Sequence, residues 1–169
     1  MTNNQRKHGV FLHRDSGGKH EQSLDQYLDW AITECKKREL VFAGNRLILR
    51  KMIDARCSAQ GDIYLDYEVS GNKLSRPGLN ALRERAKSDR NLTHIFIARR
   101  DRLARPDDPI DALAIEKELR GLGITLVYQD KIVGPLKPGE RPDIGELVSG
   151  VVDYFKAGTE RRDLASKVI

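Results

Sequence analysis

Short apolar runs alternate with longer segments of helical periodicity along this 169-residue chain. The apolar runs have the length and the β-branched and aromatic content of buried strands, and they lie at residues 9–13, 62–67, 93–99 and 123–129. The other segments carry apolar residues at helical spacing, which predicts helices at about 22–38, 46–60, 77–87, 106–122 and 143–168. Because strands that alternate with helices are joined by crossovers, the sequence predicts an α/β fold with a mostly parallel central sheet flanked by helices.

Glycine and proline set the expected boundaries of these elements. Gly61 is expected to end the second helix, at the usual cap position. Asp107 or Asp108 is expected to cap the fourth helix. The segment 131–142 contains three prolines and two glycines and is expected to form a loop.

The composition narrows the classes of protein that are compatible with this fold. A net charge of +5 and a pI near 9.3 favour a polyanionic partner. No apolar run approaches the ~20 residues that span a bilayer, so no membrane association is expected. Cys35 and Cys57 form no Cys-x-x-Cys pair and are expected to be reduced thiols in a cytoplasmic protein. The four histidines lack metal-ligand spacing, so we expect no metal.

Polar residues follow three of the predicted strands. Arg14 and Ser16 follow the first strand, residues 66–70 end and follow the second, and residues 100–105 follow the third. Functional sites in parallel sheets lie beyond the carboxyl ends of the strands. We therefore expect these separate stretches to meet at one edge of the sheet.

The stretch after the third strand is densely cationic, with Arg99, Arg100, Arg102 and Arg105 around Asp101. A guanidinium group is always charged, and its fork of donors matches the oxygens of a phosphate. A solvated basic turn is the alternative interpretation of such a run on its own.

Three motifs occur in a fixed order along the chain. They are Arg14-Asp-Ser16, then Asp66-Tyr-Glu-Val-Ser70-Gly before Arg76-Pro-Gly-Leu79, then Asp101-Arg-Leu-Ala-Arg105. In this order they resemble the catalytic domain of the serine recombinases, the family of resolvases, invertases and phage integrases. The resemblance implies a resolvase-like catalytic domain with a long C-terminal helix.

The resemblance also implies a reaction. Ser16 would attack a DNA phosphate and become joined to a 5′ end, and the released 3′ hydroxyl would later reverse the step on a new partner. The ester conserves the bond energy, so neither ATP, nor a metal, nor any other cofactor is expected. The residues implied as catalytic are Ser16, Arg14, Asp101, Arg102 and Arg105, and those implied as supporting or phosphate-binding are Ser70, Arg76 and Arg85.

The implied partners are DNA and further copies of the chain, as a homodimer and as a tetramer in the synaptic complex. The apolar stripe of the predicted helix at 143–169 is expected to support self-association. Residues 1–169 are expected to form one catalytic domain, with a downstream DNA-binding domain absent from this chain.

The chain departs from the family pattern beside the predicted nucleophile and in the segment that follows it. Asp15 stands between the arginine and the serine, where the family has a hydrophobic residue, and a carboxylate there opposes attack on a phosphate unless an arginine pairs with it. The segment 20–44 is interpreted as an insertion or as an unusual first helix.

Two other functions remain open at this point. The run Ser16-Gly17-Gly18-Lys19 resembles the phosphate loop of ATP pyrophosphatases, which would make the chain a nucleotide-binding protein. Asp15 motivates the second alternative, a recombinase-like domain that binds DNA or assembles without catalysis.

Overall fold

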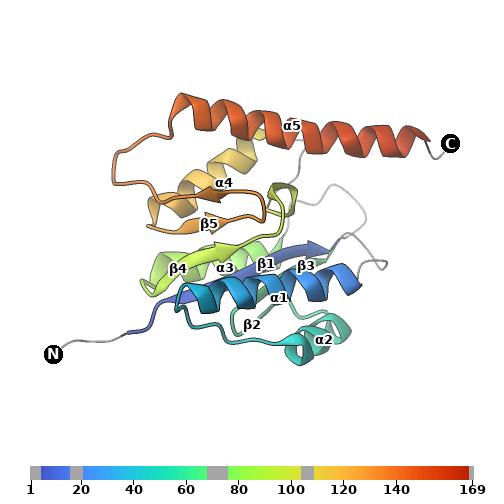
Figure 1. The fold of residues 1–169 in the computed structure, drawn as a ribbon, viewed down its shortest axis with the longest axis vertical. Coiled ribbons are helices and arrows are strands. Elements are labelled where there is room, and N and C mark those ends of the chain that lie inside the picture. Colours follow the sequence, from blue (N-terminus) through green and yellow to red (C-terminus); the bar gives the residue numbers. More distant parts are fainter. Residues whose placement is uncertain (1–4, 16–20, 68–75, 104–108, 168–169) are drawn as a thin grey trace.

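A computed structural model describes residues 5–15, 21–67, 76–103 and 109–167; for residues 15, 21, 22, 101 and 157–167 it describes the backbone alone. The strands in this part of the chain are β1 (His8–Asp15), β2 (Ala59–Gln60), β3 (Ile63–Tyr67), β4 (Leu92–Phe96), β5 (Thr125–Val127) and β6 (Ile132–Val133). The helices are α1 (Glu21–Lys37), α2 (Arg46–Ala55), α3 (Pro77–Ser88), α4 (Pro109–Gly121) and α5 (Ile144–Lys167), with a 3-10 turn, η1 (Arg100–Arg102). Figure 1 shows their arrangement.

The described strands form one mixed sheet in the order β2-β3-β1-β4-β5-β6. The central strand β1 pairs in parallel with β3 and β4, and β4 pairs in parallel with β5. The short edge strands β2 and β6 are antiparallel to their neighbours. The predicted α/β fold with a mostly parallel sheet is confirmed.

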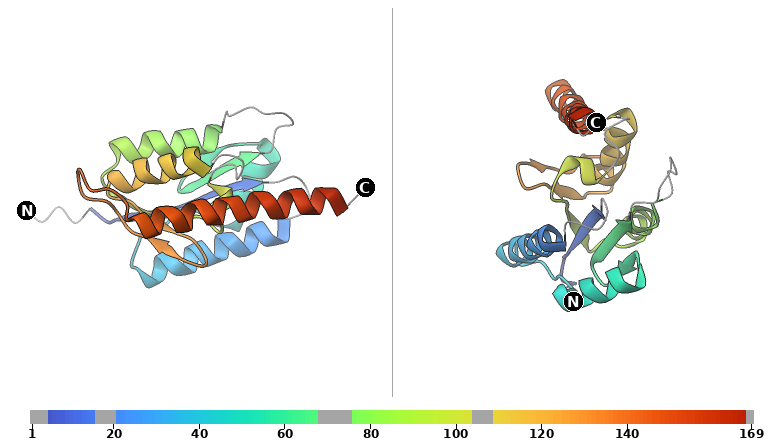
Figure 2. Two further views of the ribbon diagram at one scale, coloured as in Figure 1. Left: turned by 90° about the horizontal axis from the view of Figure 1, so that it is seen from above. Right: turned by 90° about the vertical axis from the view of Figure 1, so that its right-hand side faces the viewer.

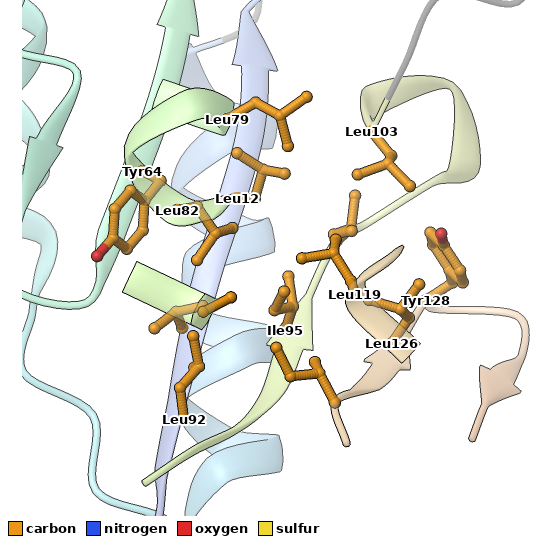
Figure 3. Packing of buried hydrophobic residues seen from close by; sticks show 14 of the residues in the cluster. Leu12, Tyr64, Leu79, Leu82, Leu92, Ile95, Leu103, Leu119, Leu126 and Tyr128 are labelled. Atoms are coloured by element: carbon orange, nitrogen blue, oxygen red, sulfur yellow. The ribbon is translucent and has the colours of Figure 1, made fainter. Parts of the chain in front are cut away.

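Helices cover both faces of the sheet because alternate residues of each strand point to opposite sides. On β1, Phe11 packs with buried side chains of α1 and α2, while Val10 and Leu12 pack with those of α3 and α4 on the other face. Figure 3 shows the second cluster, which reaches Leu103 after η1 and Tyr128 after β5. The site at the carboxyl edge therefore rests directly on the core.

The last helix, α5, lies beyond the β5 end of the sheet and runs alongside α4 (Figures 1 and 2). Its C-terminal half extends past the side of the sheet at which β1 ends (Figure 2). No helix among the described residues is long and apolar enough to cross a membrane.

The second helix is shorter than predicted. It ends at Ala55, because Arg56 adopts the left-handed conformation (φ 50°) and its N–H bonds to the carbonyls of Ile53 and Met52. The chain then turns back as β2, and Gly61, the expected cap, instead occupies the turn into β3 with φ 58°.

Two further segments bear on the sequence predictions. One of them differs from its predicted structure, and the sequence allows two interpretations of the other. The expected loop 131–142 contains β6, whose two residues pair with Leu126 and Val127 and are too few to show a period. The segment 20–44 contains α1, which buries Leu24, Leu28 and Cys35 against the sheet and is part of the domain core. The expected cap residues of α4 lie outside the described residues.

Candidate active site

Three chain segments meet where the parallel strands end. In β1, Arg14 is paired in register with Asp66 of β3. The third segment, η1, follows β4 and reaches β1 through Arg102, whose Nη1 donates a 3.0 Å hydrogen bond to the carbonyl oxygen of Arg14. The described residues of the three motifs therefore lie together at one edge of the sheet, as predicted.

Arg102 retains donor capacity in this arrangement. Its side chain is half-buried, and its buried Nε has no hydrogen-bond partner within the described ranges. A buried donor without an acceptor is costly, and guanidinium donors match anionic oxygens well. The arrangement can thus offer a permanent cation to a phosphate near the end of β1.

Asp66 fixes the start of α3 on the end of β3. Its buried carboxylate accepts hydrogen bonds from the backbone N–H of Gly78 at 2.7 Å and of Leu79 at 3.1 Å, and from Nε of Arg76 at 3.0 Å. The first turn of a helix has free N–H groups and a positive dipole end, so a carboxylate stabilises it. The sequence motif contained Asp66, but its capping role depends on a contact that spacing does not reveal.

Arg76 links the carboxylate of Asp66 to the backbone of η1 and the residue after it. Its Nη2 donates to the carbonyl oxygen of Arg102 at 2.9 Å, and its Nη1 donates to that of Leu103. Its side chain is only 13% exposed. These contacts hold the backbone of the arginine turn.

Arg85 does not join the site. Its Nη1 lies 2.7 Å from Oδ1 of Asp62, directly before β3, and its Nε lies 3.1 Å from Oδ2 of Asp89. Asp62 and Asp66 are ~13 Å apart along the strand, and Arg76 and Arg85 are ~13.5 Å apart along the helix. The two aspartates therefore anchor opposite ends of α3, and Arg85 lies at the end of this helix away from Arg76.

The remaining predicted residues can be located only by their position along the sequence. Ser16 follows the last residue of β1 and lies outside the described residues, as do Ser70 and Arg105. Asp101 is the middle residue of η1, and its side chain is likewise outside the description. Among the described residues, no three His, Cys, Asp or Glu side chains are grouped as metal ligands.

Arg100, the first residue of η1, has contacts that its sequence motif did not predict. Its guanidinium binds the carboxylate of Glu116 in α4 with two hydrogen bonds, of 3.0 and 3.1 Å, and Asp153 of α5 with one of 3.0 Å. Its Cζ also lies 5.6 Å from the ring centroids of Tyr128 and Tyr154. Burial opposes the charge of Arg100, but Glu116 outweighs it and the pKa is raised. These partners are remote in sequence, so no local pattern indicated them.

Comparison with known proteins agrees with the motifs. The family model described as Resolvase, N terminal domain, matches residues 46–168, which extend from α2 to α5 and include Asp66, Arg76 and η1. The strand β1, with Arg14 at its end, precedes the matched residues. No curated protein matches the chain. The match extends over most of the chain, and we conclude that this protein belongs to the resolvase N-terminal domain family.

Proposed function

We propose that this chain is the catalytic domain of a serine site-specific recombinase, with Ser16 as its nucleophile. The observation that carries the proposal is the 3.0 Å hydrogen bond from Arg102 to the carbonyl of Arg14. Arg102 belongs to the arginine motif and lies within the residues that the family model matches. Arg14 lies near the end of β1, outside the matched residues and two positions before Ser16. Arg102 thus lies near the chain position of the nucleophile, and its buried Nε has no hydrogen-bond partner within the described residues.

In the proposed reaction, Ser16 Oγ forms a bond to a DNA phosphorus as the bond from phosphorus to the 3′ oxygen breaks. The serine proton leaves, the released 3′ oxygen takes up a proton, and the protein remains on the 5′ end. Arg14, Arg102 and Arg105 would neutralise the charge that develops on the phosphoryl oxygens. Asp101 would orient one of these arginines or accept the serine proton. Attack by the 3′ hydroxyl of another strand on the phosphoserine reverses the step.

The structure supports different roles for the predicted supporting residues. Arg76 would act indirectly, because its donors hold the backbone carbonyls of Arg102 and Leu103. Arg85 would stabilise the fold at the far end of α3. Ser70 remains a candidate phosphate-binding residue on the strength of its motif.

Asp15 favours one alternative within the same family, a domain that binds DNA without cleaving it. Asp15 ends β1 and directly precedes Ser16, so an ionised carboxylate there would repel an incoming phosphate. The nearby arginines could compensate this charge. The ATP-pyrophosphatase interpretation leaves the arginine motifs unexplained, whereas the family assignment accounts for them.

The proposed partners are DNA and further copies of the chain. Several apolar side chains of α5 are exposed, with Ile144 77%, Val152 46% and Phe155 63% accessible. Such an apolar surface on one helix is typical of an interface. We propose that α5 supports a homodimer and, in the synaptic complex, a tetramer.

The test is to trap a covalent complex without metal. The protein is incubated in EDTA with a pool of random-sequence DNA duplexes, then denatured, and DNA-linked protein is measured. Ser16→Ala should abolish the linkage and leave DNA retention unchanged, and Arg102→Ala should slow its formation by about 10²–10³. Ser88→Ala, at the exposed end of α3, is the matched control and should react normally. DNA retention with no linkage by the unsubstituted protein would instead support the binding module.

A further inference from the structure

The two arginines at the ends of η1 reach in different directions. Arg102 donates to β1, at the proposed catalytic edge. Arg100 reaches α4 and α5, through Glu116 and Asp153. The same three-residue turn is therefore attached to the proposed site at one end and to the last helix at the other.

The Arg100 side of this turn is tightly enclosed. The side chains of Arg100 and Glu116 are 11% and 3% exposed. Oε1 of Glu116 also accepts hydrogen bonds from the hydroxyls of Tyr128 at 2.7 Å and Tyr154 at 2.8 Å. Burial, followed by the negative charge of Glu116, raises the pKa of Tyr154, so this hydroxyl stays a donor at neutral pH. Because these hydrogen bonds satisfy the buried ion pair, they hold the Arg100 and Glu116 side chains in one geometry.

One turn of α5 completes the enclosure. Asp153 binds Arg100 and Lys131, and Tyr154 covers the guanidinium. Gly150 permits the close approach, because a Cβ at this position would lie 2.7 Å from Cδ2 of Leu113 in α4. If α5 moved away, the pair between Arg100 and Glu116 would lose two partners and become exposed to water, where ion pairs constrain their members weakly.

We infer that Arg100 is a positioning residue that makes the geometry of the catalytic turn η1 depend on the docking of α5. The inference deepens the proposed function and rests on it for its catalytic consequence. Arg76 of the segment before α3 fixes the far end of the turn through the carbonyls of Arg102 and Leu103. If α5 moves, the Arg100 end of η1 should therefore become less constrained, while α3 should stay anchored on β3.

The structural part is tested by hydrogen exchange on the 169-residue chain without DNA. The reporting amides are those of Arg102 and Leu103, which bond to the carbonyls of Arg99 at 3.0 Å and Arg100 at 3.1 Å. Asp153→Asn should speed their exchange by about tenfold, as expected for loss of one charged hydrogen bond. Arg100→Lys should do the same, because an ammonium cannot form the paired bonds to Glu116. The amide of Phe11 in β1 should not change.

Glu146→Gln is the matched control. Glu146 also lies on α5, but it pairs with Arg120 of α4, at 3.1 Å, rather than with Arg100 of η1. It should leave exchange of the two η1 amides unchanged. Unchanged exchange in Asp153→Asn and Arg100→Lys, or an equal increase in Glu146→Gln, would overturn the coupling. Asp153→Asn alone decides the matter if Arg100→Lys fails to fold.

The catalytic part is tested with the covalent-linkage assay in EDTA. Asp153→Asn should form the DNA linkage about tenfold more slowly, with unchanged DNA retention and a normal rate for Glu146→Gln. Faster η1 exchange with an unchanged linkage rate would overturn the role of Arg100 in positioning. No linkage by the unsubstituted protein would overturn the proposed function, while the exchange data would still decide whether α5 and η1 are coupled.

Discussion

At the scale of single residues, Gly78 shows how closely the site is built on the core. A Cβ at this position would lie 2.6 Å from the carbonyl oxygen of Leu65 and 3.0 Å from Oδ1 of Asp66. The first of these atoms belongs to the backbone of a central strand and cannot move aside. The absence of a side chain at Gly78 therefore lets Asp66 cap α3 and bind Arg76.

Gly78→Ala should lower the free energy of unfolding by about 1–3 kcal/mol, because the added methyl group overpacks this contact. Urea denaturation of the 169-residue chain measures the change. Gly121→Ala is the matched control, since a Cβ there meets no atom within 4 Å, and it should be neutral or slightly stabilising. Equal stability of the two variants would show that α3 adjusts freely on β3.

The sequence indicated the residue types of the site better than their roles. The meeting of Arg14 with Arg102 follows from strand ends that share one sheet edge, and that rule applies to any parallel sheet. The roles of Arg76 and Arg85 depend on which aspartate each one reaches, and the two aspartates lie only four residues apart, directly before and within β3. Only the relative placement of α3 and β3 decides this.

At the scale of elements, periodicity found the long helices and the central parallel strands. It missed β2 and β6, because each has two residues and is defined by its antiparallel partner rather than by a pattern of its own. It also extended the second helix past Arg56, whose left-handed conformation ends it without a glycine. The two missed strands are the outermost strands of the sheet, on either side of the parallel strands that carry the site.

The docking of α5 should depend on pH through Asp153. Burial of its carboxyl group opposes ionisation, but Lys131 and Arg100 outweigh burial and lower its pKa. A lowered folded-state pKa stabilises the fold above the unfolded value of about 3.9, and this contribution is lost as pH falls through the folded-state pKa. The stability difference between the unsubstituted chain and Asp153→Asn should thus be constant near neutral pH and shrink below about pH 4. Urea titrations across pH measure it, and a difference that grows on acidification would contradict this account of α5.

At the scale of the whole molecule, the exposed apolar face of α5 contrasts with its buried residue Tyr154. Tyr154 belongs to the core cluster, so α5 is already docked on its own domain by another face. Val152, on the exposed face of α5, is 46% accessible and is a candidate contact in the proposed dimer.

Val152→Glu should weaken self-association without unfolding the domain, because this side chain is 46% exposed. Sedimentation velocity over a range of protein concentrations measures association, and circular dichroism monitors the fold. Ile110→Glu, on α4 with 77% exposure, is the matched control and should associate normally. Unfolding of Val152→Glu would indicate that this face of α5 covers its own sheet.

The central claim is that Ser16 is joined to DNA at the edge defined by Arg14 and Arg102. Mass spectrometry of the covalent complex trapped in EDTA, after digestion of both protein and DNA, tests this claim most directly. We expect one modified peptide, with a 5′ nucleotide attached through its phosphate to Ser16. A nucleotide on another residue, or DNA cleavage that leaves no nucleotide on the protein and stops when magnesium is chelated, would contradict it.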